Sequence, residues 1–276
     1  MSHIHIPDGV LPTWLWAGGW VLTLVFVFFA GRLAERNDVR RKVPLLAVVA
    51  ALMLVAMSSE IVPLAYHVNL TVVAGVLLGP VLSVIAAFIV EVVLAMLGHG
   101  GVTVLGLNTL MIASEMVVGW ALFRGLVYVL TRRRVRAATF LATVLTLAFT
   151  TTLLVGLVAV SGGGNATARE TGALDPTTMS FGNPLSAGVF RAGLFDSAGT
   201  RAAPAQQPGR PAAEPSLSVA RFAAVVYTLG PVGWLLEALI SAWVLGYVAR
   251  VRPGLLWDGP LERRDHAVIG DGQVSG

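Results

Sequence analysis

The stretch "TWLWAGGWVLTLVFVFFAG", residues 13–31, contains no charged side chain and decides the class of fold. A helix of this length rises about 28 Å, which is close to the hydrocarbon thickness of a bilayer, about 30 Å. The run is too long for the core of a signal peptide, no basic region precedes it, and no small-residue cleavage site follows it. We therefore expect a membrane helix that is retained in the mature protein.

Apolar runs of this kind recur along the whole chain. Hydrophobic residues make up 56% of the sequence and charged residues only 12%, against about a quarter charged in soluble domains, and the mean hydropathy is +0.78. We predict an all-α integral membrane protein with a single membrane domain over residues 1–276. The pI of about 10.1 comes mostly from arginine and does not indicate nucleic-acid binding. The absence of cysteine excludes disulfides and thiolate metal sites.

Seven membrane spans are the simplest division of the sequence, which predicts a bundle of about seven transmembrane helices. We place the spans at residues 11–31, 44–59, 69–79, 81–97, 105–131, 138–160 and 219–250. The third span is short, and the "LLGP" motif at residues 77–80 predicts a tight break before the fourth. The third and fourth spans could instead form one broken element, which would reverse the direction of every later span.

Basic residues test this division, because arginine and lysine gather in loops on the cytoplasmic side of a membrane. They cluster after the first, fifth and seventh spans: Arg32, Arg36, Arg40, Arg41, Lys42, Arg132, Arg133, Arg134, Arg136, Arg250, Arg252, Arg263 and Arg264. The connections near 60–68 and 98–104 contain none. The amino terminus is therefore predicted outside and the carboxyl terminus in the cytoplasm. Residues 161–218, rich in Gly, Ala and Pro, are expected to form a long, disordered external loop.

Four of the five histidines fall on the predicted external face. They are His3, His5, His67 between the second and third spans, and His99 between the fourth and fifth. Neutral imidazoles suit borderline divalent metals such as Ni, Co, Cu and Zn. A single interfacial histidine is more often merely amphipathic. The group of histidines at one face nevertheless indicates a metal site, with His99 as an additional candidate.

An amino-terminal segment offers ligands that an internal segment lacks. The α-amine of Met1, a deprotonated backbone amide and a nearby imidazole can form fused chelate rings in one plane. Square-planar nitrogen ligation is typical of Ni(II) and Cu(II). One further imidazole, for which His67 is well placed, would complete the plane.

Four motifs resemble one known family. They are "HIPDGVLP" at residues 5–12, "YHVNLTVVAGVLLGP" at 66–80, "GHGGVTVLGLN" at 98–108 and "GWLLEALISAWVLGYVARVRPGLL" at 233–256. The resemblance is to the CbiM/NikM family, the substrate-binding membrane subunits of energy-coupling-factor transporters for cobalt and nickel. It implies a seven-helix subunit whose first helix delivers the amino terminus into a cavity. It also implies that Ni(II) or Co(II) is the transported substrate and that there is no permanent cofactor.

The family's two metal-binding histidines correspond to His5 and His67 in this sequence. In the family the first histidine directly follows the initiator methionine, whereas here the segment "MSHI" precedes His5. Removal of Met1 would expose a new amine that chelates together with His3, and a retained Met1 would form a longer chelate with the same histidine. Alternatively, His3 replaces the amine beside His5. We favour this last arrangement, because it keeps His5 and the following "IPDG" in the family's register.

Further polar residues are candidates for supporting the ligands. Asp8 could orient a histidine ring, and Asn108 matches the first of two family asparagines, of which the second position is Met111 here. Three glutamates lie inside predicted spans: Glu91, Glu115 and Glu237. Ionisable residues are costly there, and we expect interhelical hydrogen bonds, deeper than the histidines, rather than metal ligation. Glu91 is kept as a candidate for supporting the ligands.

The resemblance also implies protein partners. They are a transmembrane coupling subunit, cytoplasmic ABC ATPase subunits and a small accessory subunit, in the plasma membrane of a bacterium or archaeon. Ala47 and Ala51 in the second span have the spacing that permits close helix approach. Packing within the chain explains this pair equally well, and the resemblance favours docking on the coupling subunit. The chain has no GxxxxGK[ST] phosphate loop, so we expect a non-enzymatic subunit that relies on partner ATPases.

Two rival functions stay open at this point. A substrate subunit for an organic vitamin would need an aromatic and polar cavity, and its uptake would tolerate histidine substitutions. An intramembrane metalloenzyme would need an open coordination position and a general base, for which Glu91 is the candidate. The absence of an H-E-x-x-H motif weighs against the metalloenzyme.

Overall fold

The computed structural model is a bundle of helices and describes residues 13–36, 42–58, 60–61, 66–97, 101–131, 134–161 and 219–257. The helices are α1 (Thr13–Arg36), α2 (Val43–Ser58), α3 (Thr71–Met96), α4 (Leu105–Leu130), α5 (Val135–Val160), α7 (Val219–Val251) and α8 (Gly254–Trp257). Two short strands, β1 (Glu60–Ile61) and β2 (Tyr66–His67), pair antiparallel with Glu60 opposite His67. The predicted helical class is confirmed, and the small hairpin is an addition that hydropathy did not predict.

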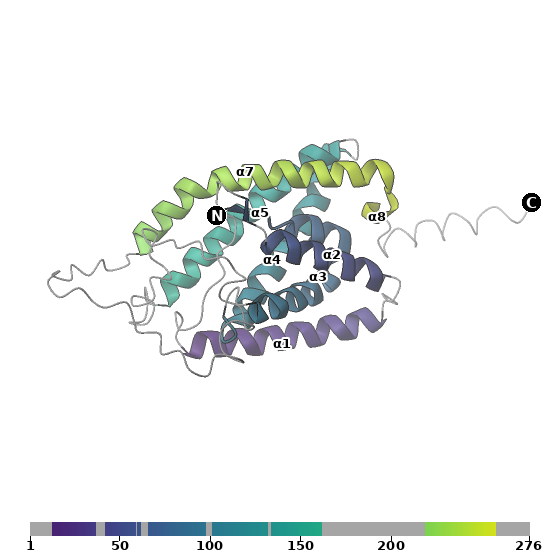
Figure 1. The fold of residues 1–276 in the computed structure, drawn as a ribbon. Helices are drawn as coiled ribbons and strands as arrows, with labels where there is room; N and C mark the ends of the chain where they lie inside the picture. The colour runs from purple at the N-terminus through teal and green to yellow at the C-terminus, as the bar shows by residue number, and fades with distance from the viewer. Residues whose placement is uncertain are drawn as a thin grey trace, which may run out of the picture.

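Helices α1 and α7 run along opposite flanks of the bundle, with α2, α3, α4 and α5 between them (Figure 1). Helix α4 is central, because it packs against α1, α3 and α5. Helix α7 lies mainly on α5. Helix α1, which follows the amino-terminal motif, and helix α3, which follows His67, therefore both pack on α4.

Among the described residues, five helices are long and apolar enough to cross a membrane: Trp14–Glu35, Thr71–Met96, Leu105–Leu130, Val135–Val160 and Ala223–Val251. Helix α2 is equally apolar but has only 16 residues. The count of seven spans depends on α2 and on how α3 is divided, so it stays a prediction. Helix α1 continues past the predicted end at residue 31 to Arg36, because arginine stems can lie along apolar surface with their charge at the interface.

The break expected at the "LLGP" motif lies inside α3. Gly79 has φ 76° and ψ 172°, a conformation that interrupts the helix and that glycine adopts at no steric cost. Pro80 follows and cannot donate the backbone hydrogen bond that would continue the first segment. Gly79 therefore divides α3 into a short first segment, 71–78, and a longer second segment, 80–96.

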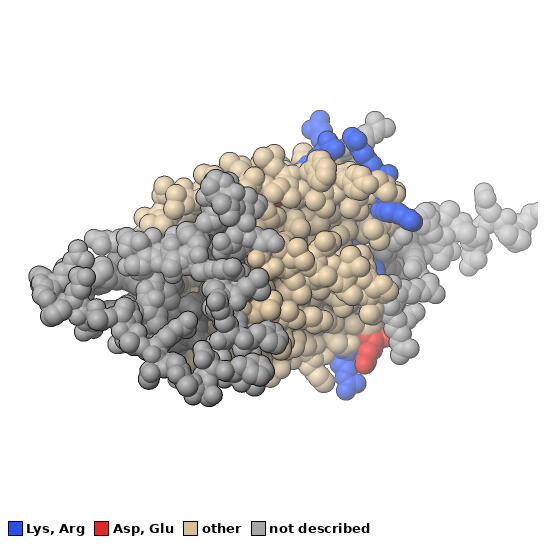
Figure 2. All heavy atoms as spheres, in the orientation of Figure 1, with Lys and Arg blue, Asp and Glu red and all other residues tan. Residues whose placement is uncertain are grey.

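The basic side chains of the described residues gather at one end of the bundle, where an acidic side chain is also seen, and the other described residues on the visible face are neither basic nor acidic (Figure 2). This end holds the carboxyl ends of α1, α4 and α7 and the amino ends of α2 and α5 (Figure 1). The distribution is the one that the positive-inside rule predicts for a cytoplasmic face.

Helices α3 and α4 approach each other through two glycines. A methyl group on Gly75 would lie 2.1 Å from the carbonyl oxygen of Met116, and one on Gly119 would lie 2.9 Å from the Val72 side chain. Small residues at a membrane helix interface permit such backbone contact. The first turns of α3 are thus packed against the middle of α4.

Candidate metal-binding site

Most of the predicted metal ligands lie outside the described residues. These are Met1, His3, His5 and His99, and Asp8, a candidate for supporting the ligands, lies outside the described residues as well. Of the predicted ligands only His67 is described, with its backbone in β2. Within the described part of the chain, no three histidine, aspartate or glutamate side chains form a group that could hold a metal. The ligand set is therefore still a prediction, and the structure bears on the elements that carry it.

A pair of glycines joins α1, which follows the amino-terminal motif, to the start of α4. A methyl group on Gly106 would lie 2.6 Å from the backbone nitrogen of Trp20, and one on Gly19 would lie 2.4 Å from the Leu107 side chain. Two hydrogen bonds reinforce the contact. The indole Nε1 of Trp20 donates to the Thr103 carbonyl oxygen at 2.8 Å, and the Thr23 hydroxyl donates to the Gly106 carbonyl oxygen at 2.6 Å.

This contact fixes where the amino-terminal motif joins the bundle. Thr13, the first residue of α1, is six residues from Gly19, or about 9 Å along the helix axis. Thr103 and Gly106 come shortly after His99 in the chain. The root of the amino-terminal segment, by which we mean the start of α1 at Thr13, is thereby held near the connection between α3 and α4.

The chain that follows His67 turns sharply into α3. Leu70 adopts the left-handed conformation, with φ 52° and ψ 16°, and it gives the helix no side-chain cap. Its carbonyl oxygen accepts a hydrogen bond from the backbone nitrogen of Ala74 at 2.9 Å, which opens the helix. A left-handed residue with a branched side chain costs about 1–2 kcal/mol, so contacts elsewhere must hold this turn.

Glu115 on α4 supplies those contacts. The Asn69 side-chain amide donates to Glu115 Oε1 at 3.3 Å, and the Thr71 hydroxyl donates to the same oxygen. All three residues are buried. The expectation that Glu115 forms hydrogen bonds between elements is confirmed.

The position of this cluster differs from what the sequence suggested. Glu115 is ten residues from the start of α4 at Leu105, or about 15 Å along the axis, and so lies near mid-helix. Asn69, two residues after His67, touches it there. The glutamate is therefore not separated in depth from the segment that carries His67, as the sequence had suggested. The Asn-x-Thr pair directly after His67, inside an apolar stretch, was the signal that could have identified the partners.

The remaining candidates are distributed over α2, α3 and α4. Glu91 on α3 and Asn108 in the first turn of α4 are buried. Ala47 and Ala51 lie on the exposed face of α2 with Val48 and Leu52. Ala50, which stands beside them in the sequence, points into the core instead.

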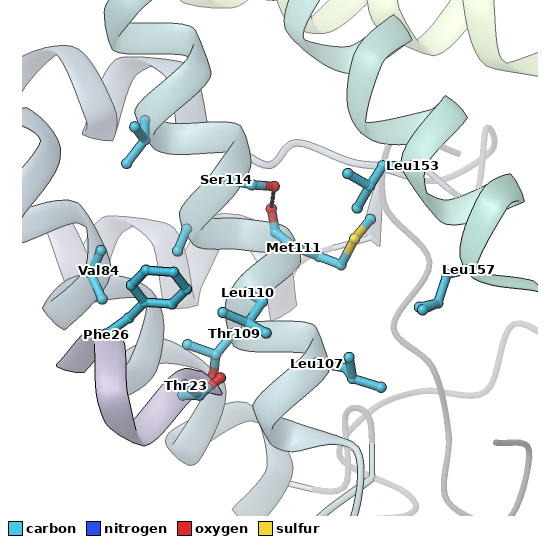
Figure 3. Close-up of a pocket in the computed structure, with 12 residues that line it drawn as sticks. Thr23, Phe26, Val84, Leu107, Thr109, Leu110, Met111, Ser114, Leu153 and Leu157 are labelled. Atoms are coloured by element: carbon cyan, nitrogen blue, oxygen red, sulfur yellow. Dashed lines mark hydrogen bonds between the residues drawn. The ribbon is translucent and has the colours of Figure 1, made fainter. Parts of the chain in front are cut away.

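An apolar cavity of about 410 Å³ lies between α1, α3, α4 and α5 (Figure 3). Its wall includes Phe26, Leu107 and Met111, the position at which the family has its second asparagine. The Ser114 hydroxyl donates to the Met111 carbonyl oxygen at 2.7 Å. The described residues that line the cavity bring no imidazole or carboxylate, so their chemistry does not suit a divalent metal.

Comparison with known proteins gives consistent results. The model of the CbiM family, described as the cobalt uptake substrate-specific transmembrane region, matches residues 5–255. A protein of Halobacterium salinarum, provisionally named cobalt transport protein CbiM, is 30% identical over 262 residues, covering 91% of this chain and 96% of that protein.

Two further relatives match shorter stretches. A protein of Haloquadratum walsbyi, provisionally named as a metal transport protein, is 36% identical over 44% of this chain and 58% of its own length. The cobalt transport protein CbiM of Clostridium tetani is 28% identical over 44% of this chain and 54% of its own length. No solved structure matches this chain.

Proposed function

This chain belongs to the CbiM family of cobalt-uptake transmembrane proteins, and from this we propose that it is the metal-binding subunit of an energy-coupling-factor transporter. It captures Ni(II) or Co(II) at the outer face of the cell membrane. The ion is transported substrate and not a resident cofactor. As a member of this family the chain is a multi-pass membrane protein, which agrees with its five long apolar helices.

The observation that carries the proposal is the family match, which begins at His5 and includes His67. The match supports a site in which His5 and His67 each give a ring nitrogen. The four residues before His5 lie outside the match and supply the remaining donor, either the amine or His3. We favour His3, with the backbone amide of His5 as the fourth ligand. Planar nitrogen ligation of this kind suits Ni(II).

The contact between α1 and α4 supports the same proposal from the structure. It holds the root of the amino-terminal segment beside residues 103–106. Asp8 and Asn108 are then candidates for hydrogen bonds to the ligands, and His99 is close in sequence to residues 103–106, which contact α1. Glu91 is buried on α3 and is a further candidate of this kind.

The subunit works with others in this proposal. Partner ABC ATPase subunits supply the energy, a transmembrane coupling subunit transmits it, and a small accessory subunit completes the complex. Ala47 and Ala51 are exposed on α2, so they offer a surface on which a partner helix can approach closely. The coupling subunit docks on this face.

Metal titration of the purified protein tests the proposed function. Isothermal titration with Ni(II) and Co(II) is expected to show one site, which His5→Ala and His67→Ala abolish. His266→Ala, in the carboxyl-terminal tail, is the control and leaves binding unchanged. The His3→Ala variant tests the ligand set, because unchanged affinity would show that the amine, and not His3, is the remaining donor. A wild-type protein that binds neither ion would contradict the proposed function.

A further inference from the structure

We propose that Glu115 is the positioning residue for His67, and that α4 serves as the common scaffold for both halves of the metal site. This inference rests on the proposed metal-binding function and names a residue that neither the family match nor the sequence motifs assign. Glu115 acts through the backbone segment 67–71 and does not bind the metal itself.

Few local restraints act on the backbone segment 67–71. Helix α3 begins without a side-chain cap, and its N-cap residue Leu70 is in the left-handed conformation. A turn of this kind persists only where the surroundings determine it. The hydrogen bonds from Asn69 and Thr71 to Glu115 lie on either side of Leu70 and supply that determination.

Helices α3 and α4 are in close contact next to Glu115. Directly after Glu115, the backbone of Met116 is in contact with Gly75, and Gly119 is in contact with Val72. The start of α3 therefore meets α4 through backbone and short side chains and cannot slide without steric overlap. Glu115 is buried directly before these contacts on α4, so its carboxylate has a fixed place from which to hold Asn69 and Thr71.

The other half of the proposed site is the amino-terminal segment, which precedes α1. The same helix α4 holds α1 through Gly106, which is nine residues before Glu115, or about 14 Å along the axis. The chain from His5 to Thr13 covers eight residues and reaches at most about 28 Å. The amino-terminal histidines can therefore reach the level of Glu115 while α1 stays in contact with α4 at Gly106. Helix α4 and the residues just before it thus contact both α1, which follows the amino-terminal histidines, and the segment that follows His67.

The test uses matched buried threonines and a conservative glutamate variant. Thr71→Val removes the hydroxyl that bonds Glu115, whereas Thr143→Val removes an equally buried hydroxyl that bonds only its own helix, to the Thr139 carbonyl oxygen at 2.9 Å. Glu115→Leu removes the acceptor, and Glu115→Gln keeps a side-chain carbonyl oxygen in its place. Affinity for Ni(II) is measured by titration, and Cu(II) is the probe for electron paramagnetic resonance.

Glu115→Leu and Thr71→Val are expected to weaken Ni(II) binding roughly tenfold or more, as loss of a group that orients a ligand does. In the Cu(II) spectrum they lose the signature of one imidazole nitrogen. Glu115→Gln restores both affinity and spectrum, and Thr143→Val matches wild type in both. These spectra report on ligation, so a general loss of stability would not reproduce the pattern.

Wild-type affinity and spectrum in both Thr71→Val and Glu115→Leu would overturn the inference while leaving the proposed function intact. If Glu115→Leu does not fold, Thr71→Val and Glu115→Gln decide the question alone. A Thr143→Val variant that weakens binding as much as Thr71→Val would also overturn it. Failure of the wild-type protein to bind metal would instead remove the proposed function on which the inference rests.

Discussion

The indole nitrogen of Trp20 donates a hydrogen bond of 2.8 Å to the carbonyl oxygen of Thr103, which lies 83 residues further along the chain. The bond ties the helix that carries the amino-terminal motif to the connection that contains His99. It lies next to the close approach of Gly19 and Gly106.

Trp20→Phe is expected to lower the free energy of unfolding by about 1 kcal/mol, because an aromatic ring is kept while the indole N–H and its hydrogen bond are lost. Thermal unfolding in detergent measures the change. Trp14→Phe is the control on the same helix, since Trp14 is 61% exposed. Equal effects of the two variants would show that the bond to Thr103 contributes nothing.

Gly106→Ala is expected to push α1 away from α4, because the new methyl group would lie 2.6–2.8 Å from the backbone of Gly19 and Trp20. Backbone atoms cannot rotate out of the way, so we expect a loss of about 1–3 kcal/mol together with weaker Ni(II) binding. Gly125→Ala on the same helix meets nothing within 4 Å and is the control. It should leave stability unchanged or raise it by about 0.5–1 kcal/mol, as alanine does in helices.

Gly79→Ala is expected to destabilise the protein by about 1–2 kcal/mol through backbone strain alone. The residue has φ 76°, where a side chain is strained, and no atom lies within 4 Å of the added methyl group. Gly79→Asn should cost at least as much, because asparagine tolerates positive φ mainly in the left-handed helical region, whereas ψ 172° lies in a region that is essentially restricted to glycine. The order of the two midpoints in thermal unfolding checks the prediction, and an alanine variant at least as stable as wild type would contradict it.

Metal affinity is expected to fall as the pH drops below about 6.5, the ordinary pKa of histidine. Imidazole must be neutral to bind metal, so protons compete with the ion, and binding at neutral pH releases protons. Titration of Ni(II) in two buffers of different ionisation enthalpy gives the number released. A binding constant that does not change between pH 7.5 and pH 5.5 would exclude imidazole ligands.

Ala47→Leu combined with Ala51→Leu is expected to leave Ni(II) binding by the isolated subunit unchanged. It should reduce recovery of the coupling subunit by co-purification several-fold, because larger side chains keep two membrane helices apart. Ala17→Leu, on the exposed face of α1, is the control. Full recovery of the complex with the double variant would place the docking face elsewhere.

The sequence predicted those features of the fold that depend on local chemistry. Apolar run lengths located the long helices within a few residues, and the adjacent Gly79 and Pro80 located the break in α3, because both act through their own backbone. The grouping of basic side chains at one end also followed from the sequence.

The contacts that organise the candidate site could not be predicted in this way. Asn69 and Glu115 are 46 residues apart, and Trp20 and Thr103 are 83 apart. Each pair meets only because whole helices pack in one arrangement, which hydropathy does not specify. The depth of the His67 segment depends on the same packing, so span boundaries placed it too far from Glu115.

The contact between α1 and residues 103–107 also has a consequence for biosynthesis. Ribosomes make a chain from its amino terminus at about 5–20 residues per second, so α1 enters the bilayer several seconds before residues 103–106 exist. During that interval it must persist as a lone lipid-surrounded helix. Its exposed apolar side chains allow this, and Leu22, Val25 and Phe29 are among them. Assembly then proceeds by association of helices already inserted, and the amino-terminal histidines reach the site only after α4 has been made.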